Sequence, residues 1–169
     1  MNQGKIFENS FKASIPDSNF YLRLKDSPAT WGTVNEKARF TPSNACDCIL
    51  HFEGVLFLAE LKSHKGKSIP FSCFRDNQLK ELAKVSCRKD EVAIAIFNFR
   101  DVAETYIVFM DNVIEFIETN NLTGNRKSIP LEWCRQIGMP MNQTLKKVNY
   151  SYAVEPAFKH LIFNVLNNQ

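Results

Sequence analysis

The sequence predicts one α/β domain in which a mixed β-sheet is flanked by helices. The chain has 169 residues, within the roughly 100–200 residues that are usual for a single domain. Segments with apolar residues at helical spacing alternate along the chain with short apolar runs of strand length. No linker or low-complexity stretch divides them, so residues 1–169 are expected to form a single domain whose helices cover its sheet.

The first half of the chain predicts two helices around a β-hairpin. Phe7 and Phe11 lie on one face of a helix over 4–12. The stretches 45–52 and 55–61 have the composition of two strands joined at Glu53-Gly54. The expected elements of this half are a helix at 4–12, a hairpin or loop at 20–41, strands at 45–52 and 55–61, and a helix at 74–86.

The second half predicts two strands followed by three helices. The apolar run of 91–99 does not alternate, which is typical of a strand buried on both faces. Asp111 is expected to cap a short helix through 117, and Gly138 to stop another. The expected elements are strands at 91–99 and 105–109 and helices at 111–117, 130–136 and 155–166. The order of elements along the chain describes a mixed sheet with helices packed around it.

One tetrapeptide, Lys-Ser-Ile-Pro, occurs twice, at 67–70 and at 127–130. Each copy precedes a helical pattern. A Ser two residues before a Pro suits an N-cap with the Pro in the first helical turn. Four shared residues are too few to indicate a repeat, so each copy is expected to begin a helix.

The composition is that of a globular protein from a reducing compartment. Apolar residues make up 44% of the chain and charged residues 23%, which is usual for globular proteins. The longest apolar run, 92–97, is far shorter than the about 20 residues that span a bilayer. The N-terminus lacks a signal-peptide pattern, and five cysteines, an odd number, make a poor disulfide framework. We therefore expect a cytoplasmic protein with no membrane partner.

Charge is distributed unevenly along the chain, whose net charge is +3. Residues 1–90 and residues 126–169 each carry +4, whereas residues 91–125 carry −5. Two basic stretches around an acidic one permit a face that binds a polyanion such as nucleic acid. A solvated surface is the simpler explanation for the same distribution.

Two carboxylates and a lysine come together if the predicted hairpin has a two-residue loop. Phe52 then pairs with Val55, and in the same register Asp47 pairs with Glu60. Directly opposed residues have Cβ atoms about 4.5–5.5 Å apart. Lys62 follows Glu60 by two residues and therefore shares its face. A one-residue bulge at the turn would remove Asp47 from that face.

This set of side chains suits metal-assisted hydrolysis of a phosphodiester. Two neighbouring carboxylates resist joint ionisation unless a cation lies between them. Oxygen ligands with open positions suit Mg²⁺ or Mn²⁺, which accept phosphate oxygens. A nearby lysine such as Lys62 can hold or deprotonate the attacking water, and His64 is a lesser alternative for that role. The competing explanation is a solvated rim held by a salt bridge.

Several motifs resemble those of a known nuclease family. Asp47 with Glu60-Leu61-Lys62 resembles the D…E-x-K core of restriction-endonuclease-like nucleases. Further motifs, in the same order along the chain, resemble those of the RecU-type Holliday junction resolvases: Asn2-Gln3-Gly4-Lys5-Ile6-Phe7-Glu8, Pro42-Ser43, Ser68-Ile69-Pro70 followed by Gln78, and Arg126-Lys127-Ser128-Ile129-Pro130 followed by Ile137-Gly138. The resemblance covers roughly residues 2–150.

The resemblance implies a homodimeric, Mg²⁺-dependent endonuclease that resolves four-way DNA junctions by paired, symmetric nicks. It implies a restriction-endonuclease-like mixed sheet flanked by helices, with a projecting stalk. A phage-encoded member fits the small size, and a recombinase is a candidate partner. The implied site residues are Asp47, Glu60 and Leu61 as metal ligands, Lys62 beside the attacking water, and Glu8 and Gln78 at the edge of the site.

DNA contacts are expected from three basic regions. The stalk would span about 31–41, with Lys37 and Arg39 as its basic contacts. Lys65 and Lys67 belong to a basic loop beside the metal site and can contact the phosphate backbone, although a solvated loop is equally compatible with them. Arg75 is a further candidate contact. The chain departs from the family at Gln3, where Arg is frequent, and at 44–46 before the first carboxylate.

Two other functions and one other metal site compete with this interpretation. A less selective restriction or repair nuclease could use the same fold, and a DNA-binding recombination accessory could carry the same residues without catalysis. Cys46, Cys48 and His51 have a spacing that suggests zinc. Both cysteines are expected on the strand face opposite Asp47, packed as small apolar residues, with His51 on the other face. No second Cys pair stands at finger spacing, so a zinc site is not predicted.

Overall fold

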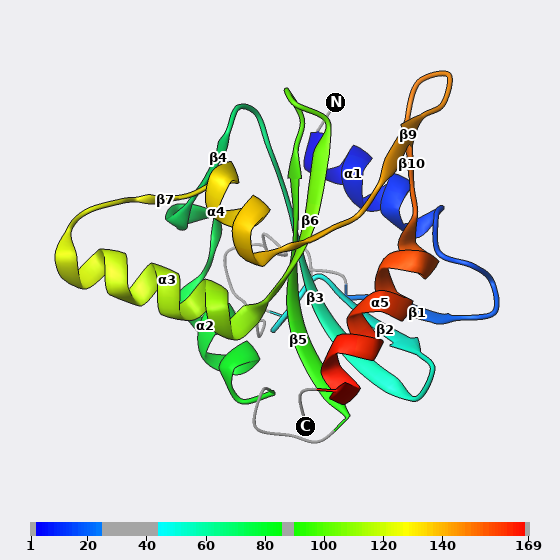
Figure 1. The fold of residues 1–169 in the computed structure, drawn as a ribbon, viewed down its shortest axis with the longest axis horizontal. Coiled ribbons are helices and arrows are strands. Elements are labelled where there is room, and N and C mark those ends of the chain that lie inside the picture. The colour runs from blue at the N-terminus through cyan, green and yellow to red at the C-terminus, as the bar shows by residue number, and fades with distance from the viewer. Residues whose placement is uncertain (1–2, 25–43, 86–89, 168–169) are drawn as a thin grey trace, which may run out of the picture.

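A six-stranded mixed β-sheet forms the centre of the molecule (Figure 1). The computed structural model describes residues 3–24, 44–85 and 90–167. The predicted stalk at about 31–41, with Lys37 and Arg39, lies outside them. The strands are β1 (Phe20–Arg23), β2 (Cys48–Phe52), β3 (Val55–His64), β5 (Glu91–Phe99), β6 (Glu104–Phe109) and β8 (Met139–Pro140). Their order is β1-β2-β3-β5-β6-β8, with β3 and β5 parallel and every other pair antiparallel.

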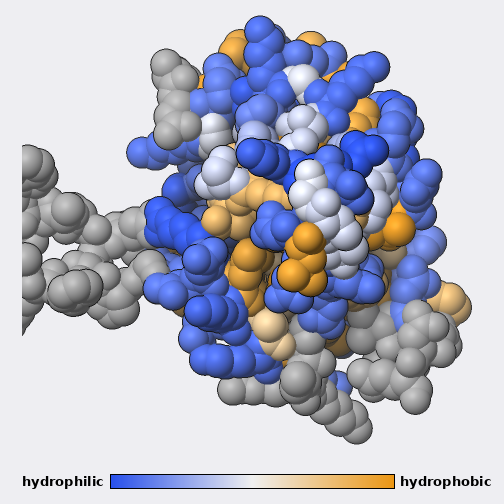
Figure 2. Space-filling model, turned by 90° about the vertical axis from the view of Figure 1, so that its left-hand side faces the viewer, coloured by the Kyte–Doolittle hydropathy of each residue, from blue (hydrophilic) through white to orange (hydrophobic). Residues whose placement is uncertain are grey.

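Helices cover both faces of this sheet. Figure 1 shows α1 (Gln3–Lys12) and α5 (Val154–Asn167) on one face and α2 (Asp76–Ala83), α3 (Met110–Thr123) and α4 (Leu131–Ile137) on the other. The surface over α2, α3 and α4 is mostly hydrophilic, with hydrophobic side chains gathered near its centre (Figure 2). The prediction of a mixed sheet flanked by helices is confirmed.

The core consists of one cluster of apolar side chains on each face of the sheet, and β5 contributes to both. Ile94 and Ile96 belong to the cluster under α1 and α5, whereas Ala95 and Phe97 belong to the cluster under α2, α3 and α4. A strand packed on both faces needs apolar residues at every position, which is why its sequence does not alternate. The prediction of a doubly buried strand at 91–99 is confirmed.

The hairpin that carries the predicted site has the expected register. Glu53 and Gly54 both have positive φ, 45° and 87°, as a two-residue hairpin loop of type I′ requires. Phe52 pairs with Val55, and the ladder continues to the pair formed by Cys48 and Ala59. The register is therefore fixed locally, by two turn residues.

The two Lys-Ser-Ile-Pro segments pair with each other, which differs from the prediction. Ser68–Pro70 is β4 and Ser128–Pro130 is β7, and they form a two-stranded antiparallel sheet in which Ile69 lies opposite Ile129. Leu131 donates its N–H to the Lys67 carbonyl, and Phe71 donates to the Lys127 carbonyl. The expectation that each serine caps a helix is wrong, because both serines belong to extended strands and the prolines stand at the N-caps instead.

Several helix boundaries also differ from the prediction. A 3₁₀ turn, Phe71–Cys73, precedes α2, so this helix begins at Asp76 and not at Phe74. Helix α3 begins at Met110 and continues to Thr123, so Asp111 lies inside its first turn and does not cap it. Gly138 ends α4 as predicted but in an extended conformation, and a Cβ there would lie 2.6 Å from the Cys134 carbonyl oxygen.

A second hairpin was not predicted. Strands β9 (Gln143–Leu145) and β10 (Tyr150–Tyr152) form a two-stranded sheet that stands beside α1 and leads into α5 (Figure 1). Both strands have only three residues, which is too short for a periodic signal. Within the described part of the chain, no helix has the length and apolar character needed to cross a bilayer.

Candidate active site

Glu60 is a fully buried carboxylate in the middle of the sheet. It lies on β3, between β2 and β5, and its exposed fraction is 0%. Burial, followed by the charge of Asp47, raises the pKa of the Glu60 carboxyl to about 7. Its Oε1 accepts hydrogen bonds from Lys62 and Gln78, whereas its buried Oε2 has no partner among the described residues. A buried carboxylate oxygen without a donor is costly unless a cation or solvent completes it.

Lys62 lies two residues further along β3, on the same face as Glu60. Its ammonium group forms an ion pair with Glu60 and stands 5.6 Å from the centre of the Phe74 ring. Only 18% of the Lys62 side chain is exposed. The ion pair thus holds Lys62 at the Glu60 carboxylate, and a small part of the Lys62 side chain remains exposed to solvent.

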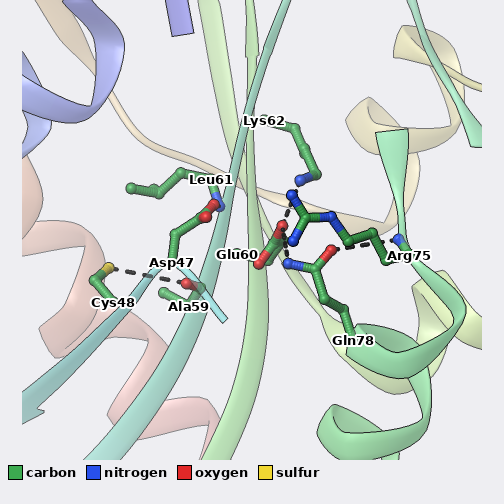
Figure 3. A network of polar contacts seen from close by, with 8 residues as sticks. All are labelled: Asp47, Cys48, Ala59, Glu60, Leu61, Lys62, Arg75 and Gln78. Carbon is green, nitrogen blue, oxygen red and sulfur yellow. Dashed lines mark hydrogen bonds and ion pairs between the residues drawn. The ribbon is translucent and has the colours of Figure 1, made fainter. Parts of the chain in front are cut away.

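Asp47 stands just before β2, one residue beyond the end of the ladder with β3. Its N–H donates to the Ala59 carbonyl (3.1 Å), and its Oδ2 accepts from the Leu61 N–H (2.8 Å). Figure 3 shows the Asp47 carboxylate beside Leu61, on the other side of the β3 ribbon from Glu60. The expected direct cross-strand pair with Glu60 is not formed, because the chain bends at 45–47. The two carboxylates nevertheless interact, since the charge of Asp47 raises the pKa of Glu60.

Gln78 joins helix α2 to the Glu60–Lys62 pair. Its Nε2 donates to Glu60 Oε1 (3.0 Å), and its Oε1 accepts the backbone N–H of Arg75 (3.3 Å). One amide therefore fixes both the carboxylate and the start of the helix. Arg75 itself is exposed, and Figure 3 shows its guanidinium in front of the Glu60–Lys62 pair.

Glu8 reaches the site from helix α1. Burial of Phe7 and Phe11 in the core fixes the helix, and Glu8 forms an ion pair with Arg23 of β1. Burial raises the pKa of the Glu8 carboxyl; Asp47 also raises it, whereas Arg23 and Lys62 lower it. The charges of Asp47 and Lys62 thus act on Glu8, and its predicted position at the edge of the site stays a prediction.

The basic loop after β3 is exposed at Lys65 and Lys67. Between them, the Gly66 N–H donates to Asp101 (3.1 Å), which ties the loop to the turn after β5. Both ammonium groups are accessible at the end of β3, within a few residues of Lys62. The DNA contacts predicted for Lys65, Lys67 and Arg75 remain predictions.

The predicted residues fit a hard divalent cation at this site. Carboxylate oxygens are the ligands that Mg²⁺ and Mn²⁺ prefer, together with waters and one or two main-chain oxygens. Glu60 Oε2, which has no partner among the described residues, and the Asp47 carboxylate supply such oxygens. Leu61, the third predicted ligand, follows Glu60 directly on β3 and donates its N–H to Asp47 Oδ2. The described residues contain no group of three or more His, Cys, Asp or Glu side chains arranged as a metal cage. A site built on two carboxylates would leave coordination positions open for phosphate oxygens.

The cysteines are separated by the fold. Cys46 belongs to the cluster under α2, α3 and α4, and Cys48 to the cluster under α1 and α5. The expectation that they share one strand face is wrong, because the strand begins only at Cys48. Burial raises the pKa of Cys46 to about 12 and also raises that of Cys48, so both stay neutral thiols. The two cysteines therefore face different layers of the fold, packed as small apolar residues.

A polar network near the site was missed by the sequence analysis. Ser63, Asn98, Thr105 and Gln143 form hydrogen bonds with one another at the end of β3 and β5. Asn98 is a single polar residue within the apolar run of β5, and that interruption was the available signal. Gln143 gave no signal, because it comes from the unpredicted β9.

The architecture defines the class of protein. A mixed sheet with helices on both faces, with Asp47, Glu60 and Lys62 at the end of the β2–β3 pair away from its turn, has the architecture of the restriction-endonuclease-like fold. The family model of Recombination protein U matches residues 20–156. The SPbeta prophage-derived uncharacterized protein YotM of Bacillus subtilis (strain 168) is 32% identical over 179 aligned residues, which cover 95% of this chain and 87% of that protein. The chain belongs to the Recombination protein U family, whose members are Holliday junction resolvases. The prophage origin of this relative agrees with the expected phage-encoded member.

Proposed function

We propose that the chain is a Mg²⁺-dependent endodeoxyribonuclease that resolves four-way DNA junctions by paired, symmetric nicks. The observation that carries this proposal is the buried Glu60, whose Oε2 has no hydrogen-bond partner among the described residues, whose pKa the charge of Asp47 raises, and which forms an ion pair with Lys62. Junction resolution is the activity of the family, and the site supplies residues suited to hydrolysing a phosphodiester.

The proposed roles follow from the position of each group. Asp47, Glu60 and Leu61 would hold Mg²⁺ (or Mn²⁺), which supplies charge neutralisation at the phosphate oxygens. Lys62 would orient the attacking water, with its ammonium kept in place by Glu60. The water oxygen forms a bond to phosphorus while the bond to the 3′ oxygen breaks, leaving a 5′-phosphate and a 3′-hydroxyl.

The surrounding residues would adjust this site and not react. Gln78 would keep Glu60 in position from α2, and Glu8 would complete the acidic edge from α1. Lys65, Lys67 and Arg75 would contact the DNA backbone, and Lys37 and Arg39 would contact the junction arms.

Two chains would be needed for paired nicks. A four-way junction has two strands related by a pseudo-two-fold axis, and a homodimer with C₂ symmetry places one site on each. A recombinase would be a natural further partner, because it produces the junctions. The reaction substrate is found where chromosomal or phage DNA recombines, which agrees with a cytoplasmic enzyme.

The site assignment is tested by three single substitutions. Asp47→Ala, Glu60→Ala and Lys62→Ala should each reduce cleavage of a synthetic four-way junction by about a thousandfold or more, a loss of the size expected for groups at the reacting centre. Junction binding measured without hydrolysis, in Ca²⁺, should remain. If Asp47→Ala protein cuts at the wild-type rate in Mg²⁺, the assignment is wrong.

Two further measurements separate the competing functions. Equal cleavage of a linear duplex and of a four-way junction would indicate a less selective nuclease. Absence of both hydrolysis and saturable Mg²⁺ or Mn²⁺ binding would indicate a DNA-binding accessory whose carboxylates form a rim. Selective, metal-dependent junction cleavage is the expected result.

A further inference from the structure

A large pocket with a mixed apolar and polar lining lies between helix α1 and the hairpin β9–β10, and none of the predicted site residues lines it. Its volume is about 830 Å³. The polar side chains that line it come from three places in the fold, and they include Asn9, Ser63, Asn98, Arg100, Gln143 and Lys146. Of the residues that the structure describes around this pocket, two are cationic and none is acidic. The pocket is therefore suited to an anionic or acceptor-rich ligand.

A chain of side-chain hydrogen bonds runs along the pocket from Arg100 to Gln143, and each group donates to the next one. Arg100 donates to Ser63 Oγ (3.2 Å), and Ser63 Oγ donates to Asn98 Oδ1 (2.9 Å). Asn98 Nδ2 then donates to Thr105 Oγ1 (2.9 Å) and to Gln143 Oε1 (3.3 Å). Thr105 Oγ1 donates to the same Gln143 oxygen (2.6 Å). Each step fixes the orientation of the next amide or hydroxyl, so the Gln143 amide cannot turn without breaking two bonds.

The last group of this network, the side-chain amide of Gln143, has an N–H donor without an acceptor among the described residues. Gln143 Oε1 accepts twice, and Gln143 Nε2 is buried without a hydrogen-bond partner in the described part of the chain. Buried donors are almost always satisfied in folded proteins, so this donor at the wall of a pocket is available to an acceptor atom of a water or of a bound ligand. With Arg100 and Lys146 nearby, a phosphate oxygen satisfies both the donor and the charges.

We propose that this pocket binds the sugar–phosphate backbone of a DNA strand, with Gln143 donating to a phosphate oxygen and Lys146 pairing with a phosphate. The proposal rests on the nuclease function above and extends the DNA-binding surface beyond the site. Ser63 follows Lys62 directly on β3, and Phe7, also in the pocket wall, precedes Glu8. Because successive side chains of a strand point to opposite faces, Ser63 and the pocket lie on the α1 face and Lys62 on the α2 face. A DNA strand bound at both places therefore has to cross the end of β3.

Two variants test the pocket by junction binding in EDTA, where hydrolysis is not needed. Gln143→Glu has nearly the same shape and still accepts from Asn98 and Thr105, but it replaces the free donor by a negative oxygen. Lys146→Ala removes an exposed charge and cannot disturb the core. Each should weaken binding about tenfold at moderate salt, and Lys146→Ala should reduce the slope of log K against log salt by about 0.9 for the lost phosphate contact.

The matched control is Lys159→Ala, which removes the same charge from the exposed face of α5, where Lys159 pairs with Glu155 (2.8 Å). The control should bind like wild type, and both pocket variants should lose affinity equally on junctions of different base sequence. Binding by both variants at the control level would overturn the proposal, and so would a loss confined to one base sequence, since that indicates base contact. Wild-type protein that binds but does not cleave would contradict the nuclease function while leaving the pocket test readable.

Discussion

At the scale of single residues, the burial of Glu60 makes the free energy of unfolding depend on pH. The carboxyl has an ordinary pKa of 4.5, and burial with the charge of Asp47 raises it to about 7 in the folded chain. Between these values the folded chain keeps a proton that the unfolded chain releases. Stability without metal should therefore fall as the pH rises from 4.5 to about 7. The difference, 7 minus 4.5, corresponds to about 3 kcal/mol.

This pH dependence is tested by removing the titrating group. Glu60→Gln should abolish the part of the stability loss that Glu60 causes, so its unfolding free energy in EDTA changes less than that of wild type between pH 5 and pH 8. Denaturant unfolding at both values measures the change. Glu118→Gln, at an exposed position of α3, is the matched control and should behave like wild type. An identical pH slope for wild type and Glu60→Gln would show that Glu60 does not titrate as described.

Metal should act on the same group with the opposite sign. A divalent cation binds the ionised carboxylates and not the protonated ones, so binding releases the proton of Glu60. Addition of Mg²⁺ at pH 8 should raise the unfolding temperature of wild type and leave that of Asp47→Ala nearly unchanged. Equal shifts in both proteins would place the bound cation elsewhere.

At the scale of elements, the paired Lys-Ser-Ile-Pro segments hold the site together from one side. Strand β4 continues from β3 and leads to the 3₁₀ turn and α2, so it connects Lys62 to Gln78. Its partner β7 leads into α4. Ile69 and Ile129 lie opposite each other, and both have an exposed fraction of 0%. The pair therefore joins two helices and the end of β3 through one buried contact.

Loss of this contact should destabilise the whole domain. Ile69→Ala and Ile129→Ala should each lower the unfolding free energy by about 3 kcal/mol, because each leaves a cavity in a closed region. The double variant should lose less than the sum, since each isoleucine packs on the other. Denaturant unfolding measures all three, with exposed Leu122→Ala as the control, expected within about 0.5 kcal/mol of wild type. Strict additivity would contradict the direct packing of the two side chains.

Local signals predicted some elements, whereas long-range contacts decided others. Glu53-Gly54 fixed the hairpin register because a two-residue turn determines which residues face each other. The apolar run of β5 identified its burial because packing on both faces excludes polar alternation. The pairing of β4 with β7 could not be predicted, since three-residue strands far apart in the sequence carry no periodic signal. The helix starts after the two prolines were predictable, because Pro70 and Pro130 stand at the N-caps of the 3₁₀ turn and of α4.

In the candidate site, too, local signals predicted some positions and long-range contacts decided others. The position of Glu60 and Lys62 on one face of β3 followed from the two-residue period of a strand. The place of Asp47 did not, because the bend before β2 depends on contacts with Ala59 and Leu61 and not on the turn. Gln143 lay outside prediction for a further reason: its network joins β3, β5, β6 and β9, and only the folded chain brings them together.

At the scale of the whole molecule, the site depends on both faces of the sheet. Glu8 comes from α1 on one face and Gln78 from α2 on the other, Gln78 donates to Glu60, and the charge of Asp47 acts on both Glu8 and Glu60. Each chain therefore contains a complete set of the proposed groups. A homodimer would carry two complete sites, and paired nicks would arise from two independent reactions on one bound junction.

Mixed dimers test whether the two sites act in this way. Differently tagged wild-type and Lys62→Ala chains can be co-expressed, and the dimer with one chain of each kind isolated through both tags. On a supercoiled plasmid with an extruded cruciform, the wild-type dimer should give linear DNA, because both strands are cut within one binding event. The mixed dimer should give nicked circles at about half the wild-type rate of first cleavage. A dimer of two Lys62→Ala chains is the control and should leave the plasmid uncut. Linear product from the mixed dimer would mean that one site cuts both strands, and a monomeric protein in solution would exclude paired cutting by a preformed dimer.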